Sequence, residues 1–243
     1  MEEKLDEQLK KRGIGIPHML GFCAAVFWIV FGFMLVIRLT AGNGGLLAAE
    51  MLRAAPPAVS GLAEKDYAGV GAMTAEYLTG KRAEFQYVAA EEDPNGACRR
   101  REVFQAHEAA HMADCRGLVA LDGWVCAGSL AVCAVCGAAG VFCGRARRLF
   151  LQGAGWGLAG FFGIAVVLGI WAAVDFDGLF VAFHRVAFPQ GGWLLDPRTD
   201  LLIRLMPVSF FIRLGVIGLL RFGLFATATL LGLWGLRKRV MRV

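Results

Sequence analysis

Charged residues are scarce in this chain of 243 residues: they make up 19% of it, whereas soluble domains carry about 25%. Hydrophobic residues make up 57%, against about 45–50% in soluble domains. A soluble domain of this length has too little interior to bury that excess. The composition therefore excludes an ordinary soluble domain and favours a membrane protein. The 32 glycines agree, because glycine lets membrane helices approach closely.

Four long apolar stretches each reach the roughly 20 residues needed to cross a hydrocarbon core. They predict an all-α membrane protein with spans at 17–40, 117–144, 149–174 and 212–236. Arg213 and Arg221 interrupt the last stretch, where snorkelling or a partner on a neighbouring helix makes a charge tolerable. No small-residue cleavage site follows the first stretch, which is also longer than the apolar part of a signal peptide, so we expect it to be retained.

Basic residues cluster in short segments beside these spans. They are Lys10, Lys11 and Arg12, then Arg145, Arg147 and Arg148, then Arg237, Lys238, Arg239 and Arg242. Because short basic loops stay in the cytoplasm, we expect a cytoplasmic N-terminal segment at 1–16, a loop at 145–148 and a tail at 237–243. Residues 41–116 would form a small extracytoplasmic cap, and residues 175–211 an extracytoplasmic aromatic loop.

The cap contains a mixture of local signals. Ala63 to Leu78 has helical character, Lys81 to Ala90 fits a strand or a helix, and turn residues fill positions 91–96. A helix is expected to resume near Arg100 and to continue into the second span. Cys98 and Cys115 lie outside the spans, where disulfides persist, so a bond between them is an open possibility.

Three of the four histidines are expected on the outer side, and two of them lie in His107-Glu108-Ala-Ala-His111. Residues i and i+4 share a helix face, so both imidazoles can hold zinc while Glu108 activates water. A membrane zinc metalloprotease is therefore one alternative. No third ligand follows at the metzincin spacing, so it would have to come from elsewhere, such as His184 or an outer aspartate.

The same helix also offers a site without metal. Glu108, His111 and Asp114 follow one another at i, i+3 and i+6 and cluster on one side. Carboxylates beside an imidazole fix its tautomer and raise its basicity, which suits a general base. The alternative for this cluster is a solvated acidic helix end without a catalytic role. For the whole protein, the non-enzyme alternative is a membrane sensor or scaffold whose outer cap binds a partner.

The segment at 175–211 interleaves aromatic and polar residues. Its members include Phe176, Phe180, Phe183, His184, Arg185, Phe188, Trp193, Asp196 and Asp200. Such a pattern predicts a segment in the lipid headgroup layer with its polar groups directed inward. An aromatic belt explains the phenylalanines but not a histidine beside an arginine. We expect Asp196 and Asp200 to be structural, through turn and N-cap bonds.

These residues resemble the lipoprotein intramolecular transacylase family of Gram-positive bacterial membranes. The similarity lies in Glu108-Ala-Ala-His111-Met112-Ala-Asp114, in Phe183-His184, in Trp193-Leu-Leu-Asp196-Pro197-Arg-Thr-Asp200-Leu-Leu-Ile203, and in Pro207 with Phe210-Phe211. The resemblance implies an acyltransferase that moves the sn-2 acyl chain of a diacylglyceryl lipoprotein to the α-amino group of its N-terminal cysteine. It implies no metal, no soluble cofactor and no nucleic acid, and an extracytoplasmic active site in the bacterial plasma membrane.

The family's functional histidines correspond to His111 and His184. We expect His111 to be the base, oriented by Glu108 or Asp114. His184, with Arg185, would then be the acid or oxyanion stabiliser, although the two roles can be exchanged. Their rings are expected within about 12 Å of each other. A lateral opening for the substrate from the outer leaflet is expected to be lined by Phe180, Phe183, Phe188 and Trp193.

Overall fold

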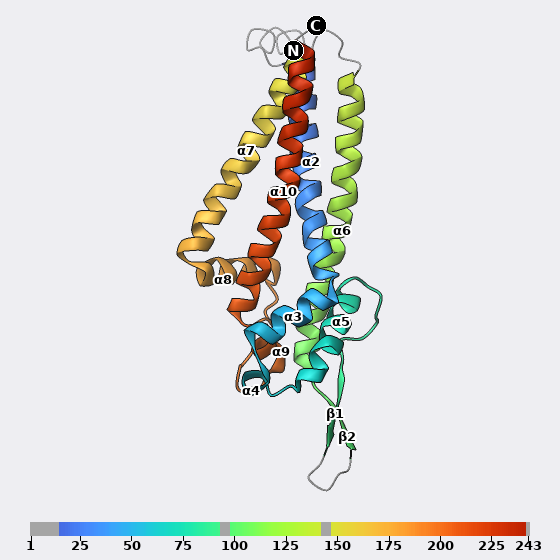
Figure 1. The fold of residues 1–243 in the computed structure, drawn as a ribbon, viewed down its shortest axis with the longest axis vertical. Helices are drawn as coiled ribbons and strands as arrows, with labels where there is room; N and C mark the ends of the chain where they lie inside the picture. Colours follow the sequence, from blue (N-terminus) through green and yellow to red (C-terminus); the bar gives the residue numbers. More distant parts are fainter. Residues whose placement is uncertain (1–14, 93–97, 142–146, 242–243) are drawn as a thin grey trace. The chain divides into compact units, whose positions relative to one another are not determined.

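The computed structural model describes residues 15–92, 98–141 and 147–241. Its elements are α2 (Ile16–Ala41), α3 (Gly44–Ala54), α4 (Pro57–Ser60), the 3-10 helix η1 (Glu64–Asp66), α5 (Tyr67–Leu78), β1 (Val88–Glu92), β2 (Cys98–Glu102), α6 (Ala106–Val141), α7 (Arg147–Val174), α8 (Phe176–Ala187), α9 (Leu201–Leu205) and α10 (Val208–Met241). Among the described residues, four helices are long and apolar enough to cross a membrane, namely α2, α6, α7 and α10 (Figure 1). The predicted four-span, all-α membrane class is confirmed.

The chain divides into two compact units. The first unit comprises residues 1–35, 124–171 and 221–243, and the second comprises residues 36–123 and 172–220. In the first unit, a Cβ on Gly21 would lie 1.9 Å from the Phe150 carbonyl oxygen, and one on Gly153 would lie 1.9 Å from that of His18. The two glycines therefore allow the backbones of α2 and α7 to touch, which any larger residue would prevent.

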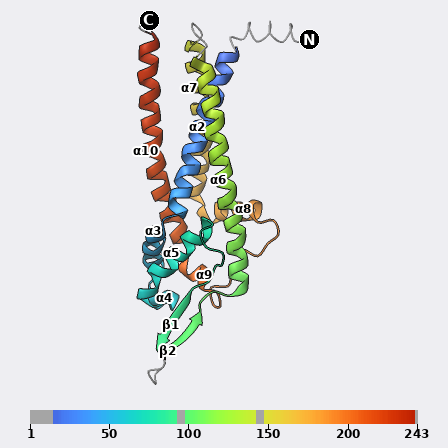
Figure 2. The same ribbon diagram turned by 90° about the vertical axis from the view of Figure 1, so that its right-hand side faces the viewer.

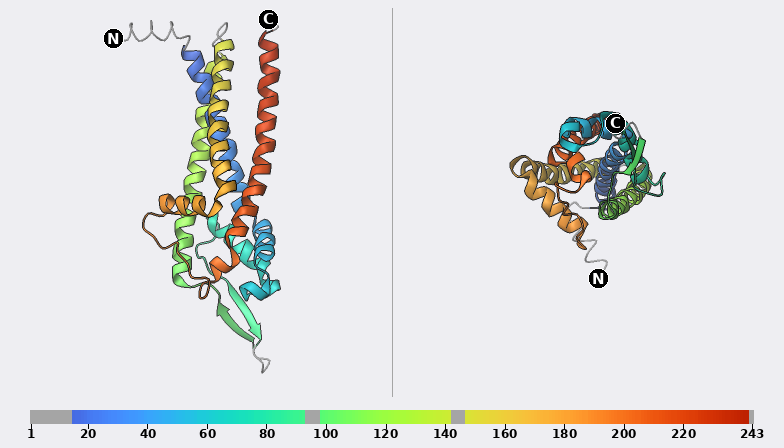
Figure 3. Two further views of the ribbon diagram at one scale, coloured as in Figure 1. Left: turned by 90° about the vertical axis from the view of Figure 1, so that its left-hand side faces the viewer. Right: turned by 90° about the horizontal axis from the view of Figure 1, so that it is seen from below.

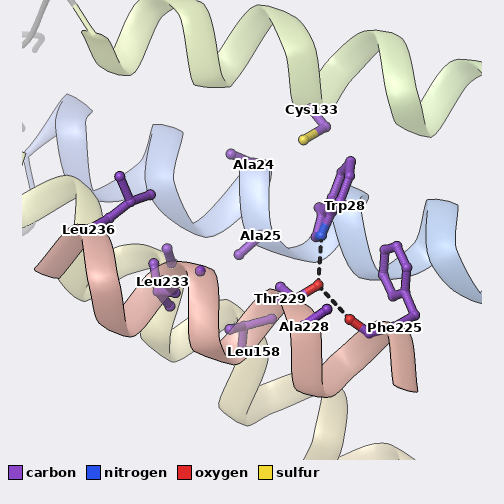
Figure 4. Close-up of a pocket in the computed structure, with 12 residues that line it drawn as sticks. Ala24, Ala25, Trp28, Cys133, Leu158, Phe225, Ala228, Thr229, Leu233 and Leu236 are labelled. Carbon is purple, nitrogen blue, oxygen red and sulfur yellow. Dashed lines mark hydrogen bonds between the residues drawn. The ribbon is translucent and has the colours of Figure 1, made fainter. Parts of the chain in front are cut away.

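An apolar cavity of about 490 Å³ lies within the first unit. Trp28 and Thr229, which both line it, are joined by a hydrogen bond of 2.9 Å from the indole Nε1 to the hydroxyl (Figure 4). That hydroxyl donates in turn to the Phe225 carbonyl at 2.9 Å. The Trp28 indole and the Thr229 hydroxyl are thus satisfied by protein neighbours, as polar groups between membrane helices need to be.

Packing of α3 against α5 starts the core of the second unit (Figure 2). On α5, Val70, Met73 and Tyr77 recur at helical spacing and are buried. They pack with Leu47 and Met51 of α3. The same cluster takes in residues from α6, α9 and α10, including Met112, Leu201, Leu202, Leu205 and Phe210.

β1 and β2 form an antiparallel hairpin in which Val88 lies opposite Glu102 and Glu92 opposite Cys98 (Figure 2). The prediction that a helix resumes near Arg100 is therefore wrong, because that residue lies in β2. The strands are paired along five residues each, and this pairing outweighs the weak strand propensity of an arginine run. The turn expected at 91–96 lies partly in β1 and otherwise outside the described residues.

The segment at 175–211 is not a loop, because it contains α8 and α9. The Asp175 side chain starts α8 by accepting a hydrogen bond of 2.8 Å from the Gly178 amide. α8 then runs crosswise to the part of α6 that belongs to the same unit (Figures 1 and 3). Arg147 and Arg148, also expected in a loop, form the first turn of α7, and the N-terminal residues 1–14 lie outside the described ranges.

We expect the substitution Gly71→Val to destabilise the second unit by about 1–3 kcal/mol through overpacking. A Cβ at this position would lie 2.5 Å from the Gly44 carbonyl oxygen and 2.7 Å from the Ala48 Cβ. Thermal unfolding of the purified protein in detergent measures the effect. Ala68→Val, on the exposed side of the same helix, is the matched control. Equal melting temperatures for the two variants would contradict close α3–α5 packing.

Candidate functional site

His111 of α6 and His184 of α8 lie beside each other in the second unit. Their ring centroids are 6.2 Å apart, which confirms the expectation that the two rings approach each other. Both side chains are buried, with 9% of His111 and 8% of His184 exposed. A separation of this size allows one reacting group to come within hydrogen-bond reach of both imidazoles.

Aromatic side chains surround the histidine pair. Phe180 and Trp193 contact His184, with ring centroids at 4.0 Å and 5.1 Å. Phe188 contacts both imidazoles, at 5.1 Å from His111 and 5.5 Å from His184, and only 3% of it is exposed. Phe183 lies 5.4 Å from His184 and is 54% exposed. Phe188 therefore supports the rings, whereas Phe183 presents an apolar surface beside them.

The nitrogens of the two imidazoles differ in their partners. His184 Nδ1 lies 2.7 Å from the Phe180 carbonyl oxygen. A carbonyl only accepts, so Nδ1 carries the proton and the neutral ring keeps a lone pair on Nε2. In the part of the chain that the structure describes, His111 Nδ1 is buried without a hydrogen-bond partner. His111 Nε2 lies 3.7 Å from the Cys115 sulfur.

Glu108 is fully buried and serves the N-terminal turns of two helices. One carboxylate oxygen accepts a hydrogen bond of 2.7 Å from the Gln105 amide, just before α6. The other accepts one of 2.6 Å from the Leu202 amide in α9. Both oxygens are therefore engaged with backbone donors, so Glu108 is a capping residue. Of the two alternatives for orienting His111, Glu108 or Asp114, the bonds of Glu108 leave Asp114.

Asp200 fixes the turn that precedes α9. Its carboxylate accepts hydrogen bonds from the Asp196 amide at 2.9 Å and the Thr199 hydroxyl at 2.8 Å, and lies 3.1 Å from His107 Nε2. Burial by itself raises the pKa of Asp200, but the hydrogen bonds from His107, Thr199 and Asp196 outweigh it, so the pKa lies below its ordinary value. These contacts stabilise the turn that precedes α9.

The prediction that the Asp200 side chain caps α9 is wrong. Asp200 occupies the N-cap position of α9, but among the described residues its side chain makes no capping bond to that helix. Glu108 supplies the acceptor instead.

Asp196 pairs with the exposed Arg198 at 2.9 Å, and hydrogen bonds from Arg198 lower the pKa of Asp196. Asp114 is half-buried on α6, and Arg185 is exposed on α8.

The HExxH segment does not have the geometry of a zinc site. His107 is held by Asp200, and Glu108 by two backbone amides, so neither is directed at a common metal position with His111. Within residues 15–92, 98–141 and 147–241, no group of three His, Cys, Asp or Glu side chains is placed to hold a metal ion. The arrangement instead suits acid–base chemistry by two imidazoles.

A sequence model of the family described as lipoprotein intramolecular transacylase Lit matches residues 22–211. The chain belongs to this family. It is thus a transacylase of the membrane-integral kind with multiple spans, and the resemblance of its motifs to the family is confirmed. A search of curated proteins gave no significant match.

Solved structures of the membrane-integral transacylase Lit from Bacillus cereus share the fold of this family member. One aligns with a TM-score of 0.67 at 17% identity, over 93% of this chain and 96% of that one. A variant with one histidine replaced by arginine gives 0.66 at 17% identity, over 98% and 96% of the two chains. A variant with alanine there gives 0.62 at 18% identity, over 97% of each. At these identities the comparison establishes the fold alone.

Two contacts in the second unit were not predicted from the sequence, one between two apolar stretches and one beside His111. Arg38 donates to the Val119 carbonyl at 3.3 Å and lies 3.8 Å from the buried Asp122 carboxylate. Arg38 and Asp122 each interrupt an apolar stretch, and two opposite charges of this kind predict that they pair with each other. The second contact is that of Cys115 with His111, and Cys115 is a free thiol in the structure. The bond between Cys98 and Cys115 considered from the sequence involves the Cys98 side chain, which lies outside what the structure describes.

We expect Glu108→Gln to destabilise the transacylase by about 1–3 kcal/mol, because a buried amide NH₂ would face a backbone N–H donor. The substitution removes one of two acceptors that now meet the Gln105 and Leu202 amides. Thermal unfolding in detergent measures the change. Glu76→Gln, at an exposed position of α5, is the control. Equal melting temperatures for the Glu108→Gln and Glu76→Gln proteins would contradict the capping role.

Proposed function

We propose that this transacylase moves the sn-2 acyl chain of a diacylglyceryl lipoprotein to the α-amino group of the N-terminal cysteine. The product is an N-acyl, S-monoacylglyceryl lipoprotein, and the reaction needs no metal. The observation that carries the proposal is the pair His111 and His184, buried with ring centroids 6.2 Å apart in a chain of this family.

Transfer of an acyl group from an ester to an amine requires two kinds of proton handling. A base has to remove a proton from the attacking nitrogen, and a donor has to stabilise the oxyanion. The departing glycerol oxygen also has to be protonated. Two imidazoles can perform these steps without a further group. Because amine and ester belong to one substrate molecule, binding brings them together.

The substrate's lipid anchor supports an approach from the membrane. Each CH₂ group contributes about 0.8 kcal/mol to burial in the bilayer, so a diacylated anchor does not leave it readily. Phe183 and Val186 of α8, and Leu194 next to Trp193 in the sequence, are exposed apolar residues, and they give this region a surface that lipid can contact. We propose entry from the outer leaflet past Phe180, Phe183 and Trp193, with the site on the extracytoplasmic side. Phe188, which was also expected to line this path, is instead buried against both imidazoles.

We expect His111→Ala and His184→Ala each to lower the transfer rate by about 10²–10⁴-fold, the usual contribution of an acid–base residue. Mass spectrometry of lipoprotein N-termini from cells that express each variant measures the N-acyl, lyso product. His18→Ala, in the first unit, is the control and should leave the product unchanged. Full activity of both site variants would overturn the proposal and favour a sensor or scaffold.

His107→Ala separates the transacylase from a zinc metalloprotease. A zinc site would lose activity on this substitution as fully as on His111→Ala, and on treatment with a chelator. The proposed reaction should survive both treatments, with a partial loss for His107→Ala because its bond to Asp200 is structural. Metal content of the purified protein provides a second reading.

A further inference from the structure

We propose that Cys115 is a positioning residue that fixes the tautomer of His111, so that His184 acts as the base and His111 as the hydrogen-bond donor. This assignment rests on the proposed function and reverses the roles expected from the sequence. It follows from the contacts of two ring nitrogens, His184 Nδ1 and His111 Nε2, each of which has a protein partner.

His184 is held as a base by its own helix. Its Nδ1–H donates to the Phe180 carbonyl at 2.7 Å, one turn earlier in α8. The tautomer with the proton on Nδ1 leaves the lone pair on Nε2. Phe180 also packs on the ring at 4.0 Å, which limits its rotation. His184 Nε2 is therefore ready to accept a proton.

Cys115 lies one helical turn after His111 on α6, with its sulfur 3.7 Å from His111 Nε2. A neutral imidazole nitrogen is a good acceptor, whereas a thiol is a weak donor and its sulfur a weak acceptor. The pair is therefore better satisfied with the thiol as donor and Nε2 as acceptor. That choice puts the proton of His111 on Nδ1.

The other nitrogen of His111, Nδ1, is the group that we assign to contact with the substrate. Nδ1 is buried and has no hydrogen-bond partner among the described residues. An unpaired buried N–H is unfavourable unless a ligand supplies an acceptor. An ester carbonyl oxygen is such an acceptor, and it becomes a stronger one as it turns into an oxyanion.

The reaction then balances with these two groups. The α-ammonium group loses one proton to water, and the neutral amine nitrogen attacks the ester carbonyl carbon. His184 Nε2 takes the second proton from that nitrogen, while His111 Nδ1–H donates to the oxyanion. Collapse of the intermediate breaks the bond from carbon to the sn-2 glycerol oxygen, and His184 passes its proton to this oxygen.

Nitrogen-15 NMR of protein with labelled histidine tests the tautomer without any substrate. In the wild type we expect a protonated Nδ1 and an unprotonated Nε2 for His111, assigned by loss of the signal in His111→Ala. Cys115→Ser should keep this pattern, because its hydroxyl also donates, and Cys115→Ala should give a mixture of tautomers. A His111 ring protonated on Nε2 in the wild type, or an unchanged ring in Cys115→Ala, would overturn the assignment even if transfer activity is present.

Kinetics of the purified protein in lipid supply a second readout. We expect Cys115→Ala to lower kcat roughly tenfold with KM little changed, a part of the effect of removing an acid–base residue. Cys115→Ser should recover most of the rate, and Cys133→Ala, in the first unit, should match the wild type. A Cys115→Ser protein as slow as Cys115→Ala, or two variants at the wild-type rate, would show that the thiol does not position His111.

Discussion

The Glu108 carboxylate joins the first turns of two helices, since one oxygen accepts from the Gln105 amide and the other from the Leu202 amide. Glu108 and Leu202 are 94 positions apart, so this contact closes a long stretch of chain. Helix N-termini favour negative charge, and one buried carboxylate stabilises both ends. Because α6 carries His111 and the segment before α9 carries Trp193, the packing around the histidine pair depends on this contact.

In the HExxH segment, His107 and Glu108 make structural contacts, and His111 lies beside His184 in the candidate site. His107 holds Asp200, and Glu108 caps α6 and α9, so two members of the motif secure the turn before α9. His111, one turn further on, reaches His184. The spacing that suggests a zinc site thus serves a different purpose: the first turn of the helix is anchored, and the next presents an imidazole at a defined place.

The features that could be predicted from the sequence are those with a local cause. Long apolar stretches have few alternatives to a membrane helix, so the four spans were predictable. Phe176, Phe180 and Phe183 have helical spacing, and this signal for α8 was assigned to an interfacial loop instead. The bond from the Leu202 amide to Glu108 has no local signal, because it joins residues brought together only by the fold.

Following the acyl chain itself tests the central claim most directly. A diacylglyceryl lipoprotein with an isotope-labelled chain at sn-2 is mixed with an unlabelled one that has a different peptide, and the purified transacylase is added in lipid nanodiscs. Mass spectrometry then identifies the chain on each N-terminus. The account predicts labelled N-acyl product on the labelled peptide alone, with an unlabelled chain left on its glycerol. Label on the second peptide, or an unlabelled N-acyl chain on the first, would contradict intramolecular transfer from sn-2.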